Sequence, residues 1–383
     1  MHNRFLIMLL LAIAPAPVAL AGDLNPTGAP ASTMKTLDEV EPRIPVGPLT
    51  TPGDADSVYR ITKSGSYYLT ENLVGQVGKH GVEIAASDVT LDLMGFTLAG
   101  RAGTLTGIFS TRVNLTVHNG VVRDWVGWGV DLSQGLNTRV SGLGVHSNDA
   151  GGVFLGQHSV IEDCIARANL GDGLVVSSEG LIVNCTADAN TGFGIAAGVG
   201  SVIRQSRASG GSGAGFLVNS GLAVGCVAET NTGDGFFAFD SILRDCNASF
   251  NSGSGINATE DTSVLDSIAS SNGAHGVVVG SRCVIVRSHF SLNGSSGVGA
   301  GVLATGDQNR IEDNAVMRGD IGFDIDGSGN FLARNTSFGA TTNYDIGAGN
   351  ICLVVTASLA GAFSGDAGGV SPGSADPNAN YAR

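Results

Sequence analysis

The stretch from Asn231 to Ala238, NTGDGFFA, decides the fold because the chain repeats it. Near-copies begin at Asn169 (NLGDGLVV), Asn190 (NTGFGIAA) and Asn251 (NSGSGINA). Each copy places a glycine before a short apolar run, and most of these glycines are 20 to 22 residues apart. They are Gly107, Gly129, Gly152, Gly173, Gly194, Gly215, Gly235, Gly255, Gly276, Gly301 and Gly322. A period of this length over most of a chain predicts a solenoid.

Each copy predicts three short strands, in the order loop, strand, short turn, strand, tight bend and short strand. The bend is occupied mostly by residue types that tolerate a left-handed backbone. These residues are Asp163, Asn184, Gln205, Gly225, Asp245, Asp266, Arg287 and Asp313. The acids among them are therefore expected to form a bend and not to act as catalytic acids.

Small residues follow each bend with strand alternation, which predicts inward-facing columns. The pairs are Cys164 with Ala166, Cys185 with Ala187, Ser206 with Ala208, Cys226 with Ala228, Cys246 with Ala248 and Ser267 with Ala269. An asparagine column follows, whose amides can bond between neighbouring coils. Its expected members are Asn148, Asn169, Asn190, Asn231, Asn251, Asn272, Asn293 and Asn314.

The six cysteines could form disulfides or remain free thiols. Cys164 and Cys185 are column neighbours, as are Cys226 and Cys246, so either pair could form a disulfide in an exported protein. Parallel side chains one coil apart hold their Cβ atoms farther apart than disulfides prefer. Buried thiols are therefore the favoured reading, with Cys283 and Cys352 also unpaired, and no cysteine or histidine spacing predicts a zinc site.

The repeat pattern N-x-G-x-G with its apolar run, together with KHGVEIAASDVTLDLMGFTL at residues 79–98, resembles the pectate-lyase-like superfamily. Residues 79–98 are similar to the first coil of many secreted bacterial β-helix repeat proteins. The resemblance implies an all-β, right-handed parallel β-helix of about 11 to 12 coils with about 21 residues each. It leaves the function open, because the superfamily includes lyases, hydrolases, epimerases and adhesins.

The flanking segments predict an exported, capped solenoid. Residues 1–21 have a basic start, a short apolar stretch and an Ala-Leu-Ala cleavage signal, as in a secretory signal peptide. We expect a linker over 22–48, an N-terminal cap over 49–78, the β-helix over 79–363 and a mobile tail over 364–383. No segment after the signal predicts a membrane span. The expected location is secreted, periplasmic or on the cell surface.

The charge and the outward residues limit the partners. A net charge of -14 opposes binding to nucleic acid. The second residue after each repeated glycine should point outward, which gives a mostly apolar row. This row is Phe109, Asp131, Phe154, Val175, Ala196, Leu217, Phe237, Asn257, Val278, Leu303 and Asp324. It predicts either a covered or partner-bound face, or an open platform for sugar rings or a protein, with Phe154 and Phe237 as contacts.

One cluster of candidate site residues falls within a single coil. His118, Arg123, Asp124 and Asp131 are candidate catalytic residues, and Trp125 and Trp128 are candidate sugar-binding rings; the six lie within 14 positions. The competing reading is that the tryptophans seal a loop and that Arg123 pairs with Asp124 at the surface.

Other chemistry is less clearly indicated. Asp324 and Asp326 share a strand face and could hold Ca²⁺, although a solvated terminal coil explains them too; no other cofactor is expected. We find no complete lyase, polygalacturonase or epimerase motif. The first hypothesis is a non-catalytic, secreted scaffold that binds a polysaccharide or a cell-envelope component. The second is a polysaccharide lyase or glycoside hydrolase acting in a groove along the β-helix, and the sequence does not decide whether the protein is an enzyme.

Overall fold

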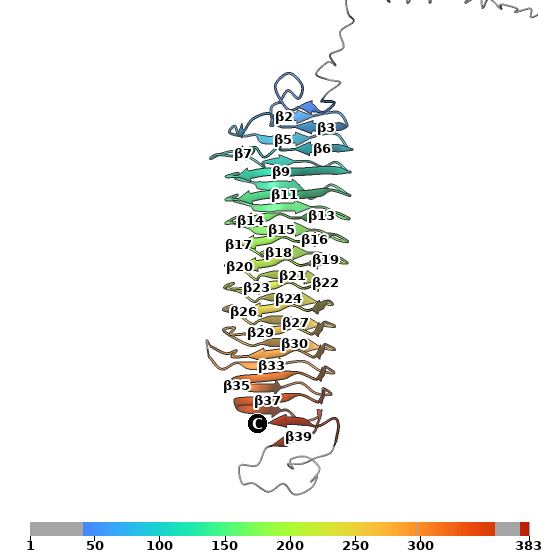
Figure 1. Ribbon diagram of the computed structural model, residues 1–383, viewed down its shortest axis with the longest axis vertical. Helices are drawn as coiled ribbons and strands as arrows, with labels where there is room; N and C mark the ends of the chain where they lie inside the picture. Colours follow the sequence, from blue (N-terminus) through green and yellow to red (C-terminus); the bar gives the residue numbers. More distant parts are fainter. Residues whose placement is uncertain (1–40, 296, 357–375, 383) are drawn as a thin grey trace, which may run out of the picture. The chain divides into compact units, whose positions relative to one another are not determined.

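The computed structural model describes residues 41–295, 297–356 and 376–382, and in these ranges it contains strands and no helix. From Arg43 onward the described residues form one unit, a column of stacked parallel coils (Figure 1). The column is a right-handed parallel β-helix of about 15 turns with roughly 21 residues per turn. The expected fold and period are confirmed. The expected number of coils was too low, because strands before residue 79 also stack in parallel as coils.

The strands form three faces of the column, which we name A, B and C. Face A contains β2 (Ser57–Ile61), β5 (His80–Ile84), β8 (Ile108–Phe109), β10 (Trp128–Leu132), β12 (Gly151–Leu155), β15 (Asp172–Val176), β18 (Ile195–Ala197), β21 (Phe216–Asn219), β24 (Phe236–Phe239), β27 (Ile256–Glu260), β30 (Val277–Ser281) and β33 (Ala300–Ala304). Along each face, strands pair in parallel with those one coil away.

Face B contains β1 (Ile44–Pro45), β3 (Gly65–Tyr68), β6 (Val89–Asp92), β13 (Val160–Glu162), β16 (Leu181–Val183), β19 (Val202–Arg204), β22 (Leu222–Val224), β25 (Ile242–Arg244), β28 (Ser263–Leu265), β31 (Val284–Val286), β34 (Arg310–Glu312), β36 (Phe331–Ala333) and β38 (Ile351–Cys352). Face C contains β4 (Leu73–Val74), β7 (Thr97–Ala99), β14 (Ile165–Arg167), β17 (Thr186–Asp188), β20 (Arg207–Ser209), β23 (Val227–Glu229), β26 (Asn247–Ser249), β29 (Ile268–Ser270), β32 (His289–Ser291), β39 (Val354–Thr356) and β40 (Asn380–Ala382). Four long strands cross a corner: β9 (Leu115–Arg123) and β11 (Arg139–His146) run from B to C, and β35 (Ala315–Ile325) and β37 (Thr336–Ile346) run from C to A.

The corners between faces are single left-handed residues. All eight predicted bend residues lie between faces B and C with φ between +48° and +63°, so that prediction is confirmed. The other two corners also turn at positive φ, for example at His158 after face A and at Ala168 and Phe250 after face C. Alanine and phenylalanine carry no sequence signal for this conformation. Only their place in the repeat reveals those corners.

The interior is filled by columns of buried side chains. On face A the inward column runs through aliphatic residues to Phe216 and Phe236, whose rings stack 4.7 Å apart at 9°. The predicted Cys, Ser and Ala columns are buried and lie in register on face C and at its corner. Because each coil repeats the same inward pattern, the outward residues can vary without disturbing the core.

An asparagine ladder binds coil to coil where face C turns toward face A. The Nδ2 amide of Asn169 donates to Oδ1 of Asn190 at 2.9 Å, and the backbone N–H of Asn169 donates to the same oxygen at 3.1 Å. Gly211 takes the next position and interrupts the ladder, which resumes at Asn231. Asn314 is a correction: it lies below Ser288 in the cysteine and serine column and binds Asn335.

The six cysteines, all among the described residues, are free thiols. Those of the inward column donate to backbone carbonyls, as Cys164 does to the carbonyl of Glu162 at 3.2 Å. Burial and the neighbouring Cys226 hold the pKa of the Cys246 thiol far above its ordinary value, with the hydrogen bond to Cys226 as the first cause. These thiols fill space in the core.

The two ends of the column differ from the expected segments. Residues 1–40, which include the expected signal peptide and most of the expected linker, lie outside the described residues, but β1 falls in the linker range and pairs with β3. In the expected tail, residues 376–382 include β40, which inserts between β37 and β39. Residues 364–375 lie outside the described residues.

Candidate functional site

The outward row of face A follows the register of the strands. Phe109 pairs with Asp131, Asp131 with Phe154 and Phe154 with Val175, and the same register continues down the column. The row therefore lies as predicted. Two of its three aromatic members, Phe109 and Phe154, lie toward the N-terminal end, where other aromatic side chains adjoin them.

Trp128 and Phe154 form the first half of an aromatic platform on face A. Their ring centroids are 5.3 Å apart and the rings are inclined by 43°. Trp128 pairs with Gly151 on the next coil, and a Cβ at Gly151 would overlap the indole ring. Glycine at this position therefore lets the Trp128 ring lie across β12.

His80 and Phe109 form the second half of the platform. Their rings stack 4.6 Å apart at 12°. The Nδ1 atom of His80 accepts the backbone N–H of Thr106 at 3.2 Å, so the neutral ring carries its proton on Nε2. Burial lowers the pKa of His80 more than nearby acids, Glu83 first, raise it. His80 was missed from the sequence, although it precedes Gly81 as Trp128 precedes Gly129.

Carboxylates lie on both sides of these rings in the outward row. Asp131 uses Oδ1 to accept the backbone N–H of Ser133 at 3.0 Å, and no described residue binds its Oδ2. Glu83 accepts the hydroxyl of Ser57 at 2.6 Å and pairs with Arg60 at 3.1 Å. The platform thus combines aromatic surfaces with hydrogen-bond acceptors at their edges.

The other members of the predicted cluster lie on different faces. His118 points outward on face B, with its Nδ1 3.8 Å from Asp92. Arg123 is on face C and pairs with Asp124 at the following corner. The coil wraps around the column between these positions, so neither joins Asp131 on face A.

Trp125 is the clearest correction among the candidate binding residues. Its side chain is 0% exposed, and its Nε1 donates to the carbonyl of Leu98 at 3.2 Å. Its backbone N–H donates to Oδ1 of Asn148 at 3.0 Å, so it takes the first position of the asparagine ladder. Trp125 seals the end of that ladder and offers no surface to a ligand.

The middle of face A is apolar. Phe237 lies between Leu217 and Asn257 in the outward row and is half-buried. The nearby Asp234 accepts the backbone N–H of Ser254 at 2.7 Å and the amide of Asn257 at 3.0 Å. Asp234 therefore holds adjacent coils together.

Acids return at the C-terminal end of face A. Asp324 points outward from β35 and pairs in register with Asp345, whereas Asp326 lies just beyond the end of that strand, so the two acids do not share a strand face as expected. Burial, followed by the charges of Asp326 and Asp345, raises the pKa of Asp324 above its ordinary value. Within the described ranges, no group of three or more His, Cys, Asp or Glu side chains could hold a metal ion.

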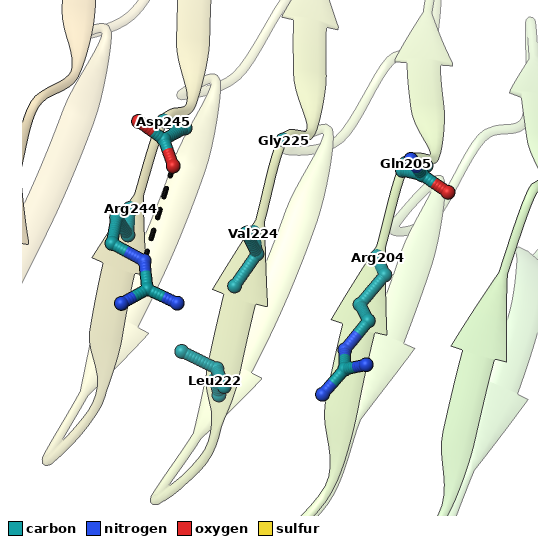
Figure 2. Close-up of a pocket in the computed structure, with 7 residues that line it drawn as sticks. All are labelled: Arg204, Gln205, Leu222, Val224, Gly225, Arg244 and Asp245. Carbon is teal, nitrogen blue, oxygen red and sulfur yellow. Dashed lines mark ion pairs between the residues drawn. The ribbon is translucent and has the colours of Figure 1, made fainter.

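Face B carries a shallow groove that the sequence reading missed. Two hollows of about 440 Å³ and 360 Å³ share Arg204 and lie over β13, β16, β19, β22 and β25. Figure 2 shows Arg204, Val224 and Arg244 on successive strands, with Arg244 turned toward Asp245 at 3.9 Å. The signal was an aliphatic residue at the start of each of these strands.

Comparisons with known proteins agree with the geometry. Residues 60–232 match the sequence family described as right handed beta helix region. The A-module of the Azotobacter vinelandii mannuronan C-5 epimerase AlgE4 aligns over 75% of this chain and 90% of its own, with 16% identity and a TM-score of 0.51. The tailspike protein of E. coli bacteriophage HK620, in complex with a pentasaccharide, aligns over 83% and 71%, with 11% identity and a TM-score of 0.55. No curated protein matches the sequence.

At these identities the likeness concerns the fold alone. The fold of the chain is a right-handed parallel β-helix. In the part of the chain that the structure describes, no helix has the length and apolar character to cross a membrane.

Proposed function

We propose that this protein is an exported scaffold that binds a polysaccharide along face A, without itself cleaving it. The observation that carries the proposal is the platform formed by Trp128, Phe154, Phe109 and His80 around Asp131. Aromatic rings pack against the apolar faces of sugars, and a carboxylate accepts their hydroxyl groups. The tailspike that shares the fold was solved with a pentasaccharide, which supports a glycan ligand.

Export and metal dependence belong to the same proposal. The N-terminal 21 residues have the pattern of a signal peptide, which would place the protein in the periplasm, at the cell surface or outside the cell. Calcium is not required for the stacking contacts, and the pair Asp324 and Asp326 is far along face A from the platform.

Affinity electrophoresis through gels containing plant, algal or bacterial polysaccharides tests the binding. We expect retardation by at least one polysaccharide, and Trp128→Ala should weaken it by about 2 kcal/mol, roughly 30-fold. Phe331→Ala is the matched control, because Phe331 is an exposed aromatic residue on face B. Retardation that is equal for Trp128→Ala and the unaltered protein would remove the platform from the proposal.

A second candidate function is hydrolysis or lyase chemistry at the same end of face A. Glu83 and Asp131 are two coils apart in the outward row, about 9.6 Å at 4.8 Å per coil, near the upper limit for inverting glycosidases. The ring of His80 lies beside the Phe109 ring between them.

Mass spectrometry of soluble products distinguishes the two functions. The protein would be incubated with each polysaccharide, with and without calcium. Unsaturated oligosaccharides would indicate a lyase and hydrated ones a hydrolase, and either activity should disappear in Glu83→Gln or Asp131→Asn. Binding without products supports the scaffold.

A further inference from the structure

Face B presents two outward columns in the middle of the protein, the first largely aliphatic and the second a mixture of aliphatic and charged residues. The first column is Arg139, Val160, Leu181, Val202, Leu222 and Ile242, and the second is Ser141, Glu162, Val183, Arg204, Val224 and Arg244. The groove over these strands is open and shallow, which suits a broad partner surface better than a small ligand. Contiguous apolar surfaces of this kind mark interaction sites on soluble proteins.

The second column carries opposite charges on the two sides of β16. Glu162 lies one coil before Val183, and Arg204 lies one coil after it. Within the described residues Arg204 has no ion pair, and Glu162 binds Arg139 through Oε1 while no described residue binds its Oε2. One acid and one base therefore lie at equal distances from β16, with bonding capacity left over.

We propose that two copies of this chain pair through face B, antiparallel, about a two-fold axis that crosses the column at β16. About this axis, each coil before β16 in one copy lies opposite the corresponding coil after β16 in the other copy. The first column of one copy faces the first column of the other, and the second column faces the second. Glu162 of each copy then meets Arg204 of the other, and Val160 meets Val202. Leu181 and Val183 meet their own counterparts on the axis, so the contact is apolar at its centre and charge-complementary beside it.

The protein already contains the arrangement that Glu162 would adopt. Glu312 occupies the same column farther along face B. Its Oε1 accepts from Arg310 at 2.6 Å, and its Oε2 accepts from Arg334 at 2.7 Å and from a second nitrogen of Arg310 at 3.1 Å, so one carboxylate holds two arginines. Glu162 would likewise hold its own Arg139 on one oxygen and the second copy's guanidinium on the other.

Light scattering after size exclusion tests the pairing in the exported form of the chain. We expect the mass of a dimer for the unaltered protein and of a monomer for Leu181→Asp, which buries two carboxylates against each other on the axis. Ile351→Asp is the matched control: Ile351 is an exposed member of the first column, two coils past β34, which is the strand that would face β1 of the second copy, so the mass of this variant should remain that of a dimer. Circular dichroism checks that both variants fold.

A mixing experiment tests the geometry itself. Arg204→Glu alone places acids opposite acids, and Glu162→Arg alone places bases opposite bases, so each should be a monomer. Mixed together, the two variants match at both contacts and should form a dimer containing one copy of each. A monomeric unaltered protein, or a mixture that stays monomeric, would overturn the proposal; the first result would leave face B to a different partner. Polysaccharide binding at face A is measured separately and is unaffected by these variants.

Discussion

Faces A and B rest on the same interior but present opposite surfaces. Behind both, buried aliphatic side chains repeat from coil to coil. Outward, face A carries rings and carboxylates around Asp131, whereas face B carries aliphatic residues around Arg204. The coil repeat therefore fixes only the inward half of each strand. The outward residues can serve a different function on each face. If they do, a substitution on one face leaves the other face unchanged.

The largest expected effect comes from damaging the interior that the faces share. Asn190 is buried, and its Oδ1 accepts two N–H groups of Asn169. Asn190→Ala leaves those donors unsatisfied and should lower the free energy of unfolding by about 3 kcal/mol. Urea denaturation measures this, with the exposed neighbour Thr191→Ala as the control. A loss below about 0.5 kcal/mol would mean that the ladder contributes little.

Adding one methyl group at position 151 should weaken polysaccharide binding at face A alone. Gly151→Ala places a Cβ where the Trp128 ring lies, so the ring must move. We expect polysaccharide affinity to fall about tenfold, or about 1.4 kcal/mol, while face B is unchanged. Gly144→Ala on face C is the control, because its Cβ would make an ordinary 3.7 Å contact with Val121. Equal affinity of the two variants would show that the position of the Trp128 ring is unimportant.

Lowering the pH should reduce the stability of the protein through two half-buried histidines at face A. Burial lowers the pKa of His80 and of His275, whose Nδ1 accepts the backbone N–H of Ala300 at 3.0 Å. The unfolded chain therefore binds more protons than the folded one between the lowered pKa and the ordinary value, so stability falls as the pH drops through about 6.5.

Urea midpoints at pH 7 and pH 5 measure this effect. The decrease between the two should be smaller in His80→Gln and in His275→Gln than in the unaltered protein. The exposed His158 on the corner beside face B provides the control variant His158→Gln. A decrease that depends on His158 and not on the other two would contradict the assignment to face A.

The smallest effect is expected at the C-terminal end of face A. Because the folded-state pKa of Asp324 is raised, its ionisation at neutral pH opposes folding, and this cost disappears as the pH falls through that pKa. Asp324→Asn should therefore raise the melting temperature slightly at pH 7 and have no effect at low pH. Asp240→Asn, at an exposed corner, should change it at neither pH. A lower melting temperature for Asp324→Asn at pH 7 would contradict the expectation that ionised Asp324 opposes folding.

Most of the fold could be predicted from the sequence, because strand alternation and the coil period act locally. The inward columns, the bend after face B and the outward row of face A all follow from position within the repeat. Asn314 was misplaced because the step from Gly276 to Gly301 is longer than the others. Counting asparagines across that longer coil assigns Asn314 to the wrong corner.

The candidate site was only partly predictable. Trp128, Asp131 and Phe154 were correctly placed on one face, since each has a defined offset from a repeated glycine. Arg123 and Trp125 were grouped with them by closeness in sequence, but the coil turns a corner at Asp124. A single left-handed residue there sends Arg123 to face C and turns Trp125 inward.

The insertion of β40 between β37 and β39 has a consequence for how the end of the column assembles. In the ladder below Ser288, Asn314 binds a residue 21 positions away, whereas Asn335 binds Asn380, 45 positions away. Doubling a loop adds only about 0.6 kcal/mol to the entropy of closing it. The longer connection therefore costs this rung little. Its place in the column is specified by the bonds of Asn380 to Asn335, Leu332 and Leu353, not by how near the segment lies in the sequence.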